Sequence, residues 1–313
     1  MQQGLVIRTT GSWYKVLPLD ARNTLVITAA TLNCRLRGNY RLRGNKQTNP
    51  VSVGDYVLFE MQEDGTGVIH EVEDRKNYIV RRATKLSKQT HVIAANIDLL
   101  CIVATLASPR TSTGFIDRLL VTAEAYHIPA AILFNKSDLM VDDELRALQQ
   151  EVGDIYRKVG YPVLEVSALE GTDVDAVKEM IAGKTVLFSG HSGVGKSALL
   201  NAISPGLGLK VGQISDWSLK GKHTTTFAEI FPIQQSTFLI DTPGIKEFGM
   251  VDFSPQELSH FFPEMRNYLH GCRFANCTHT HEPDCAIKKA VVDGLISEER
   301  YRNYLNILED IIS

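Results

Sequence analysis

One run of residues in the chain has the types and spacing needed to hold a phosphate chain. It reads Gly-x-x-x-x-Gly-Lys-Ser, between an apolar run (184–189) that suits a strand and a helix-forming run (198–203). In that setting the glycines let backbone N–H groups surround a phosphate, the lysine reaches the outer phosphates, and the serine hydroxyl binds Mg²⁺. A glycine-rich turn without a ligand is the alternative, and the flanking runs disfavour it. The predicted nucleoside triphosphate loop is Gly190, His191, Ser192, Gly193, Val194, Gly195, Lys196 and Ser197.

A second run could select the base. Asn-Lys-Ser-Asp follows an apolar stretch, and its last residue, Asp138, can accept hydrogen bonds from the ring N–H and the exocyclic amine of guanine. Adenine offers no such pair of donors. Alone, such a tetrapeptide is usually a surface turn; in a chain with a phosphate loop it predicts guanine binding. The residues expected at the base are Asn135, Lys136, Ser137, Asp138, Ser167 and Ala168.

Two further stretches could sense the γ-phosphate. Asp241-Thr-Pro-Gly244 follows an apolar run, so the aspartate could reach the Mg²⁺ shell while the Gly244 N–H meets the γ-phosphate. His223-Thr-Thr-Thr226 could form the other switch, in which one threonine, expected to be Thr225, completes the Mg²⁺ shell. Each stretch alone would be read as a turn or a loop. Together with the phosphate loop they predict the switch segments of a GTP hydrolase.

The order of these motifs indicates a rearranged domain. Apolar runs alternate with helical spacing from about residue 88 to residue 182, which predicts a parallel sheet with ligands at the carboxyl ends of its strands. Most GTPases place the phosphate loop first, whereas here the base-recognition run precedes it. A circular permutation of this kind is allowed because the termini of a domain usually lie close together. The chain then leaves the domain just after Asp241–Gly244.

The N-terminal region is basic and rich in short β-type runs. Residues 1–94 hold 14 Lys/Arg against 8 Asp/Glu, although the whole chain has a net charge of −3. The runs within residues 1–73 fit a small barrel, and an oligonucleotide-binding (OB) fold is the leading candidate. Four arginines could give this barrel a cationic face that contacts RNA; a solvated hairpin is the alternative. They are Arg35, Arg37, Arg41 and Arg43.

A cluster of thiols and imidazoles near the C-terminus predicts a metal site. Cys272, Cys277 and Cys285 lie within 14 residues, and either His279 or His281 could complete a tetrahedral set of ligands. The rest of this region reads as amphipathic helices. A domain this small buries little apolar surface, so we expect one structural zinc ion to hold it folded.

Composition limits the class of protein. Hydrophobic residues make up 44% and charged residues 22%, which indicates packed globular domains. The N-terminus lacks the pattern of a signal peptide, and the longest apolar region, residues 99–109, is too short to span a bilayer. We therefore expect a cytoplasmic monomer without a membrane partner.

In its motif order, basic front and Cys/His cluster, the whole chain resembles the RsgA (YjeQ) family of circularly permuted GTPases. The resemblance implies GTP hydrolysis to GDP and phosphate, stimulated by the small ribosomal subunit, with Mg²⁺ as the nucleotide's metal. It also implies rRNA contact and a role in late maturation of that subunit. From the family's Cys-x4-Cys-x-His-x5-Cys spacing it implies His279, with the three cysteines, as the zinc ligand.

The resemblance also bears on catalysis. Ras-like enzymes carry a water-orienting glutamine at the position that Ile245 occupies here, and isoleucine cannot orient water. The family points to His223 as the substitute, because an imidazole can orient water near neutral pH. A loop histidine used in packing or RNA contact is the alternative. At His191 the family usually has glutamine, and we expect this side chain to face outward and leave phosphate binding intact.

These inferences give a multidomain chain. Its parts are an OB-fold β-barrel (1–73), a basic linker (74–87), an α/β circularly permuted P-loop GTPase domain (88–247) and an α-helical zinc-binding domain (248–313). The alternative function is an RNA-associated GTP sensor whose hydrolysis is incidental. A metabolic P-loop kinase is disfavoured, because the sequence offers no evident site for an acceptor substrate.

Overall fold

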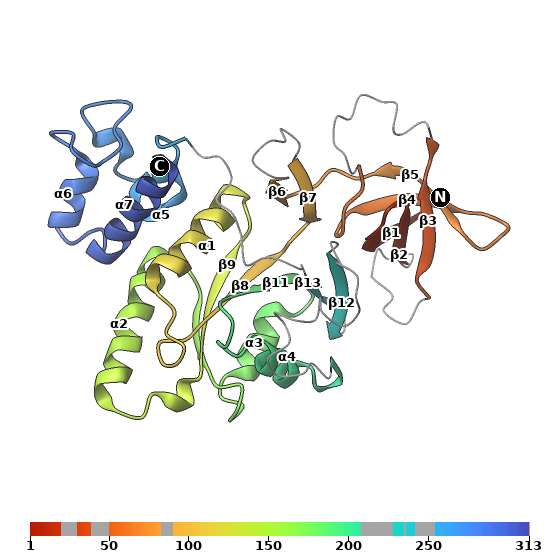
Figure 1. Ribbon diagram of the computed structural model, residues 1–313, viewed down its shortest axis with the longest axis horizontal. Helices are drawn as coiled ribbons and strands as arrows, with labels where there is room; N and C mark the ends of the chain where they lie inside the picture. The colour runs from red at the N-terminus through yellow and green to blue at the C-terminus, as the bar shows by residue number, and fades with distance from the viewer. Residues whose placement is uncertain are drawn as a thin grey trace.

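A computed structural model describes residues 1–19, 30–38, 50–82, 90–207, 228–234, 236–241 and 254–312. Figure 1 shows a barrel at the N-terminal end, a central sheet with helices, and a helical C-terminal region on the far side of the central layer. This is the three-part architecture expected from the sequence.

Among the described residues, five strands close the N-terminal barrel. They are β1 (Gln2–Thr10), β2 (Trp13–Pro18), β3 (Leu32–Leu36), β4 (Tyr56–Met61) and β5 (Gly67–Val72). The pairing runs β1-β2-β3-β5-β4 and back to β1, with only β3 and β5 parallel among these pairs. Side chains that alternate along the strands, among them Tyr14, Cys34 and Phe59, fill the interior. The OB-like barrel is thereby confirmed.

The segment expected to be a basic linker contains regular structure instead. Strands β6 (Tyr78–Arg82) and β7 (Thr90–Ala95) form an antiparallel hairpin. Arg75 binds the buried carboxylate of Asp55 at 2.7 and 2.8 Å, and Lys76 pairs with Asp98. Local ion pairs thus neutralise two of the basic charges in this segment.

The central sheet is parallel except at one edge. Its strands are β8 (Leu99–Ala104), β9 (Ala130–Asn135), β10 (Val163–Val166), β11 (Thr185–Ser189), β12 (Glu229–Gln234) and β13 (Thr237–Asp241). They lie in the order β10-β9-β8-β11-β13-β12, and only β12 runs antiparallel to its neighbour β13. Because the chain winds outward in both directions from β8, the order reverses between β8 and β11, which is where ligands bind in such sheets.

Helices cover both faces of this sheet (Figure 1). They are α1 (Thr113–Ala125), α2 (Asp143–Val159), α3 (Val174–Ile181) and α4 (Lys196–Ile203), with short 3₁₀ turns η2 (Ser137–Leu139) and η3 (Pro205–Leu207). Strand β8 is apolar throughout because its alternate residues serve both faces. Leu100 and Ile102 pack in the cluster with α1 and α2, whereas Cys101 and Val103 pack with α3 and α4.

The barrel and the central sheet are joined edge to edge. Arg8 of β1 pairs antiparallel with Glu229 of β12, and their side chains form an ion pair of 3.6 Å. In the part of the chain that the structure describes, this pairing joins eleven strands into one sheet that runs from β10 into the barrel.

The C-terminal region packs short helices around a longer one. They are η6 (Leu258–Phe261), α5 (Pro263–Arg266), η7 (Leu269–Gly271), α6 (Ala286–Val292) and α7 (Glu298–Ile312). Before η6, the Glu257 carboxylate accepts hydrogen bonds from the Ser254 N–H and hydroxyl, which is one half of a capping box. Within the described residues, no helix combines the length and the apolar character needed to cross a membrane.

Candidate functional site

The phosphate loop lies where the sheet order reverses. It links the end of β11 to the start of α4, so the N-terminus of that helix points into the loop. Gly190, Gly193 and Gly195 have φ values of +151°, +85° and +93°. Gly195 also lies close to a neighbouring side chain, because a Cβ there would fall 2.3 Å from Nδ2 of Asn135. This position therefore needs glycine for both its backbone angle and its space.

Asn135 ties three loops together. It is the last residue of β9 and is buried. Its Nδ2 donates to the carbonyl of Val194 at 2.9 Å, and its Oδ1 accepts from the N–H of Ala168 at 3.1 Å. The base-recognition run, the Ser167-Ala168 loop and the phosphate loop thus meet through one amide side chain.

Asp138 lies half-buried beside Asn135, at the ends of the same strands. The Ser167 hydroxyl donates to Oδ1 of Asp138 at 2.6 Å, which orients the carboxylate. Lys136 adopts a left-handed backbone conformation, with φ of 66°, and its Nζ donates to the carbonyl of Ser108 at 2.7 Å. The structure therefore brings together base-recognition residues that lie 29 and 33 residues apart in the sequence.

Within the phosphate loop, Lys196 binds the backbone. Its ammonium donates to the carbonyls of Gly190 and His191 at 2.7 and 2.6 Å. The neighbouring Ser197 is buried in the first turn of α4. Both side chains belong to the end of the loop from which a triphosphate and its Mg²⁺ would be held.

His191 is exposed, as expected, but one face of its ring is covered. The ring stacks on Phe115 of α1, with centroids 3.6 Å apart and planes inclined at 27°. Burial, together with the nearby Lys196 ammonium, lowers the pKa of His191 below its ordinary value. A neutral imidazole at neutral pH is suited to stacking against an aromatic ring.

Several predicted residues lie outside the described residues. These are His223, Thr225, Gly244, Ile245, Arg41 and Arg43. Asp241 is the last residue of β13, which places its backbone at the same edge of the sheet as the phosphate loop.

Two of the four predicted RNA-contacting arginines are on the exposed side of the barrel. The Arg35 guanidinium lies over the ring of Trp13, 3.9 Å from its centroid, and a nitrogen of Arg37 lies 3.4 Å from Nδ1 of His70. Trp13 was not singled out from the sequence; the β2–β3 pairing, which sets it opposite Arg35, reveals it.

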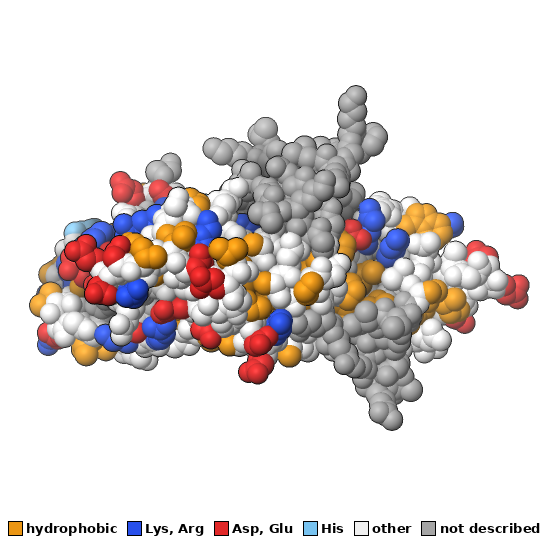
Figure 2. Space-filling model, turned by 90° about the horizontal axis from the view of Figure 1, so that it is seen from below, with side chains coloured by type: hydrophobic (Ala, Val, Ile, Leu, Met, Phe, Trp, Pro, Cys, Tyr) orange, Lys and Arg blue, Asp and Glu red, His pale blue; other side chains and the backbone are white. Residues whose placement is uncertain are grey.

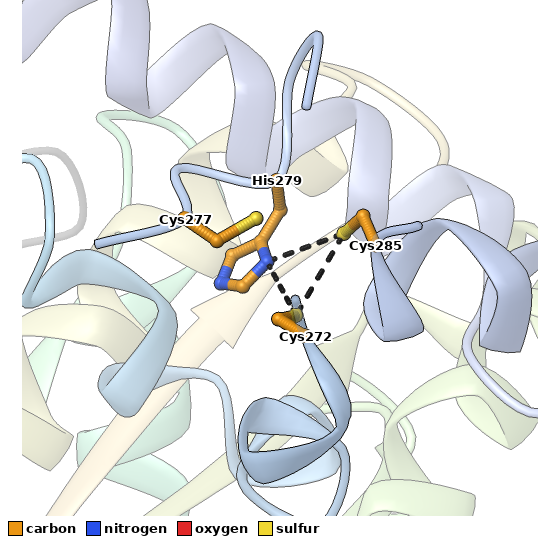
Figure 3. A group of neighbouring side chains, drawn as sticks. All are labelled: Cys272, Cys277, His279 and Cys285. Carbon is orange, nitrogen blue, oxygen red and sulfur yellow. Dashed lines mark hydrogen bonds between the residues drawn. The ribbon is translucent and has the colours of Figure 1, made fainter. Parts of the chain in front are cut away.

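A metal-binding geometry is present in the C-terminal region (Figure 3). The ligand atoms of Cys272, Cys277, His279 and Cys285 all lie within 4.8 Å of one another. Nδ1 of His279 is 3.5 Å from Sγ of Cys272 and 3.4 Å from Sγ of Cys285, and these two sulfurs are 3.9 Å apart. Sulfur atoms 2.3 Å from a tetrahedral ion would be about 3.8 Å apart. The cluster could therefore hold a metal ion.

The chemistry of these donors also suits a cation. Burial lowers the pKa of His279, so its imidazole is neutral, which is the form that binds a metal. Burial also raises the pKa of Cys277 to about 12, so a nearby cation is needed to stabilise its thiolate. Nδ1 of His279 faces the sulfurs, while its buried Nε2 has no hydrogen-bond partner in the part of the chain that the structure describes. His281 is exposed and lies outside the cluster, with its Nδ1 near the Thr280 hydroxyl.

Residues that the sequence did not single out support this cluster. The Tyr301 and Tyr304 hydroxyls of α7 donate to the carbonyls of His279 and Thr278 at 2.6 and 2.8 Å. Glu282 accepts from the N–H groups of Thr278 and Thr280; although burial alone would raise its pKa, these hydrogen bonds lower it to about 2. Helix α7 and the loop of ligands are thus one unit.

Comparisons with known proteins agree with this geometry. A family model described as RsgA GTPase matches residues 72–251, and one described as RsgA N-terminal domain matches residues 3–69. A Bacteroides thetaiotaomicron protein named small ribosomal subunit biogenesis GTPase RsgA 2 is 51% identical over 308 residues, which cover 98% of this chain and 96% of that protein. A Bacteroides fragilis protein with the name small ribosomal subunit biogenesis GTPase RsgA is 50% identical, with the same coverage.

Solved structures give the same result. The crystal structure of YjeQ from Thermotoga maritima matches with a TM-score of 0.81 and 34% identity, covering 100% of this chain and 99% of that one.

Proposed function

The chain belongs to the RsgA GTPase family, and from this premise we propose that its hydrolysis of GTP to GDP and phosphate serves the late maturation of the small ribosomal subunit. The observation that carries the proposal is the bridge made by Asn135, which joins the base-recognition run to the phosphate loop. A site built this way holds a guanine base and its phosphates in one fixed relation.

We propose the following roles for the nucleotide site. Asp138, oriented by Ser167, accepts hydrogen bonds from guanine, and the Lys136 stem covers the base. The backbone of residues 190–196 and the Lys196 ammonium bind the phosphates. Ser197, Thr225 and Asp241 hold the Mg²⁺ shell, while Gly244 meets the γ-phosphate.

His223 is the proposed water-orienting residue, because Ile245 lacks a polar group for that task. Because Ile245 offers no polar group at the usual position, turnover by the chain alone should be slow. Binding of the small subunit would then bring His223 to the attacking water and raise the rate.

We propose that the barrel contacts rRNA through Arg35, Arg37, Arg41 and Arg43. The stacked pair of Arg35 and Trp13 supports this, since guanidinium and aromatic faces together suit phosphates and unstacked bases. In this division of labour, 1–73 binds RNA, 74–87 leads to the GTPase domain (88–247), and 248–313 is the zinc domain. A cytoplasmic monomer that meets the subunit in solution fits these roles.

Zinc is the proposed metal of the C-terminal cluster. Three thiolates and one imidazole close a tetrahedral shell, which is typical of structural zinc sites. With Cys272, Cys277, His279 and Cys285 as ligands, zinc would fix the loop that carries them against α7.

The test is GTP turnover by the full-length, zinc-loaded protein with and without purified small ribosomal subunits. We expect stimulation by the subunit, and we expect His223→Ala to lose it while keeping its affinity for GTP. A stimulated rate unchanged in His223→Ala would remove this histidine from the mechanism. Absence of any stimulation in the unmodified protein would favour the alternative, an RNA-associated GTP sensor with incidental hydrolysis.

A further inference from the structure

Helix α1 lies between the nucleotide site and the C-terminal region. At its first turn, the ring of Phe115 stacks on His191 of the phosphate loop, with centroids 3.6 Å apart. The loop that precedes the helix reaches the same site, since a Cβ on Gly193 would lie 3.2 Å from Pro109. The N-terminal end of α1 is thus built against the phosphate loop.

The other side of α1 carries the C-terminal region. Asp117, two residues after Phe115, accepts hydrogen bonds from Arg300 through Oδ1 and from Asn303 through Oδ2, at 2.5 and 2.7 Å. Arg300 also donates to both carboxylate oxygens of Glu264, at 2.7 and 3.0 Å. Arg300 is 1% exposed and Asp117 is fully buried. We call these four residues the α1–α7 latch.

Less buried pairs surround the latch. Thr113 donates to Glu299 at 2.5 Å, and Arg118 pairs with Asp310 at 2.6 Å. Buried charges cannot slide past one another, because any displacement leaves them without partners in a medium that solvates them poorly. Helix α7 should therefore either stay docked on α1 as one body or separate from it, and α7 also carries the tyrosines that hold the metal-binding loop.

Phosphate binding should change the hydrogen bonds around His191. The Lys196 ammonium donates to the carbonyls of Gly190 and His191, and a phosphate bound in the loop would attract the same ammonium. Binding therefore changes the interactions of the residue whose ring rests on Phe115. Two residues farther along the helix, the latch begins.

We propose that Phe115 is a positioning residue of the nucleotide site, which couples phosphate binding in the loop to the docking of the C-terminal region on α1. The inference rests on the proposed function in taking a guanine nucleotide as the ligand. Because linkage is reciprocal, the factor by which nucleotide favours docking equals the factor by which docking favours nucleotide, in the range of about 5- to 150-fold.

The test measures hydrogen exchange of the α7 amides in the full-length, zinc-loaded protein, with and without GDP and Mg²⁺. We expect GDP to slow exchange about 5-fold or more in the unmodified protein. Phe115→Ala should bind GDP more weakly and, at saturating GDP, lose this slowing; Phe115→Tyr, which keeps a stacking ring, should retain it. Met61→Ala, at an exposed residue of barrel strand β4, is the matched control and should behave like the unmodified protein.

The reciprocal arm measures GDP affinity in latch variants. Arg300→Met removes the cation that pairs with the buried Asp117 and the half-buried Glu264, so the milder Asn303→Ala, which leaves the Arg300–Asp117 pair intact, is measured beside it. Both should bind GDP more weakly. A full α7 response in Phe115→Ala, or unchanged GDP affinity in both latch variants, would overturn the coupling. If the unmodified protein binds no guanine nucleotide, the proposed function fails first and the inference fails with it.

Discussion

Replacing Arg300 with methionine should lower the free energy of unfolding by an amount that can be estimated from the contacts of its side chain. The guanidinium makes one hydrogen bond to Asp117 and two to Glu264, and it is 1% exposed. Methionine fills much of the volume but leaves both carboxylates without their cation. Removing one partner of a buried ion pair costs about 3–5 kcal/mol. That is a factor of roughly 10² to 10⁴ in the unfolding equilibrium.

The cost should depend on pH in a defined direction. Burial already raises the pKa of Asp117 above its ordinary value, and Arg300 is the main group that opposes this rise. Without Arg300 the pKa of Asp117 rises further, so the folded variant binds a proton at a pH where the unfolded chain does not. The free energy of unfolding of Arg300→Met should therefore be lower than that of the unmodified protein by the full amount near pH 7. This difference between the two proteins should shrink as the pH is lowered toward 5.

Urea denaturation of the zinc-loaded chain, followed by circular dichroism at pH 7 and pH 5, measures both effects. The matched control is Arg302→Met on the same helix, whose side chain is 59% exposed and pairs with Glu298 and Glu299. Exposed pairs of this kind contribute about 0–1 kcal/mol. Equal losses in the two variants, or a deficit in Arg300→Met that does not change with pH, would refute the reasoning.

Three further predictions follow from the site. His279→Ala should lose the bound metal, measured by metal analysis, and its α7 amides should exchange rapidly, whereas His281→Ala should keep the metal; equal loss in both would exclude His279 as the specific ligand. Asp138→Asn should weaken GDP binding by about 10²-fold or more, since two hydrogen bonds to a charged group contribute about 1.5–3 kcal/mol each; Asp143→Asn, which is 99% exposed, should not, and similar calorimetric titrations of the two would count against the guanine assignment. By NMR titration the pKa of His191 should lie below 6.5 and rise toward it in Phe115→Ala, because the burial that lowers it is reduced. In the unmodified protein this histidine's contribution to stability is then lost as the pH falls through about 6.5, where the unfolded chain takes up the proton first; a pKa at or above 6.5 would contradict the stacked geometry.

Short-range patterns predicted which residues the fold brings together at the carboxyl edge of the central sheet. Asn135, Ser167 and Gly190 each follow an apolar run, and parallel strands bring their carboxyl ends to one edge of a sheet. The motif that follows each apolar run therefore predicted where the carboxyl end of that strand lies in the sheet. The spacing of the cysteines did the same for the metal-binding cluster, although spacing alone left His279 and His281 open.

The latch could not be predicted from the same patterns. Asp117 and Arg300 are charged residues in amphipathic helices, and such residues usually face solvent. Each is buried because it pairs with the other, 183 residues away in the sequence. The hydrophobic periodicity of a single helix cannot predict a contact at that separation. The hairpin of β6 and β7 was missed for a related reason. Its basic composition suggested a linker, whereas two asparagines, Asn77 and Asn96, hold its ends through hydrogen bonds to backbone across the domain border.

The pairing of Arg8 with Glu229 joins the barrel to the central sheet, so removing the barrel would change the edge of that sheet. Strand β12 is the outer strand of the central sheet, and an outer strand offers unpaired backbone groups to other chains. At one end, β1 covers this strand; near the other, Pro232 has no N–H to offer. By covering one end of β12, the barrel should reduce pairing of this strand with other chains. A shortened chain that begins at residue 74 would expose the Glu229 end of β12, and light scattering should show it associating with itself more readily than the whole chain does.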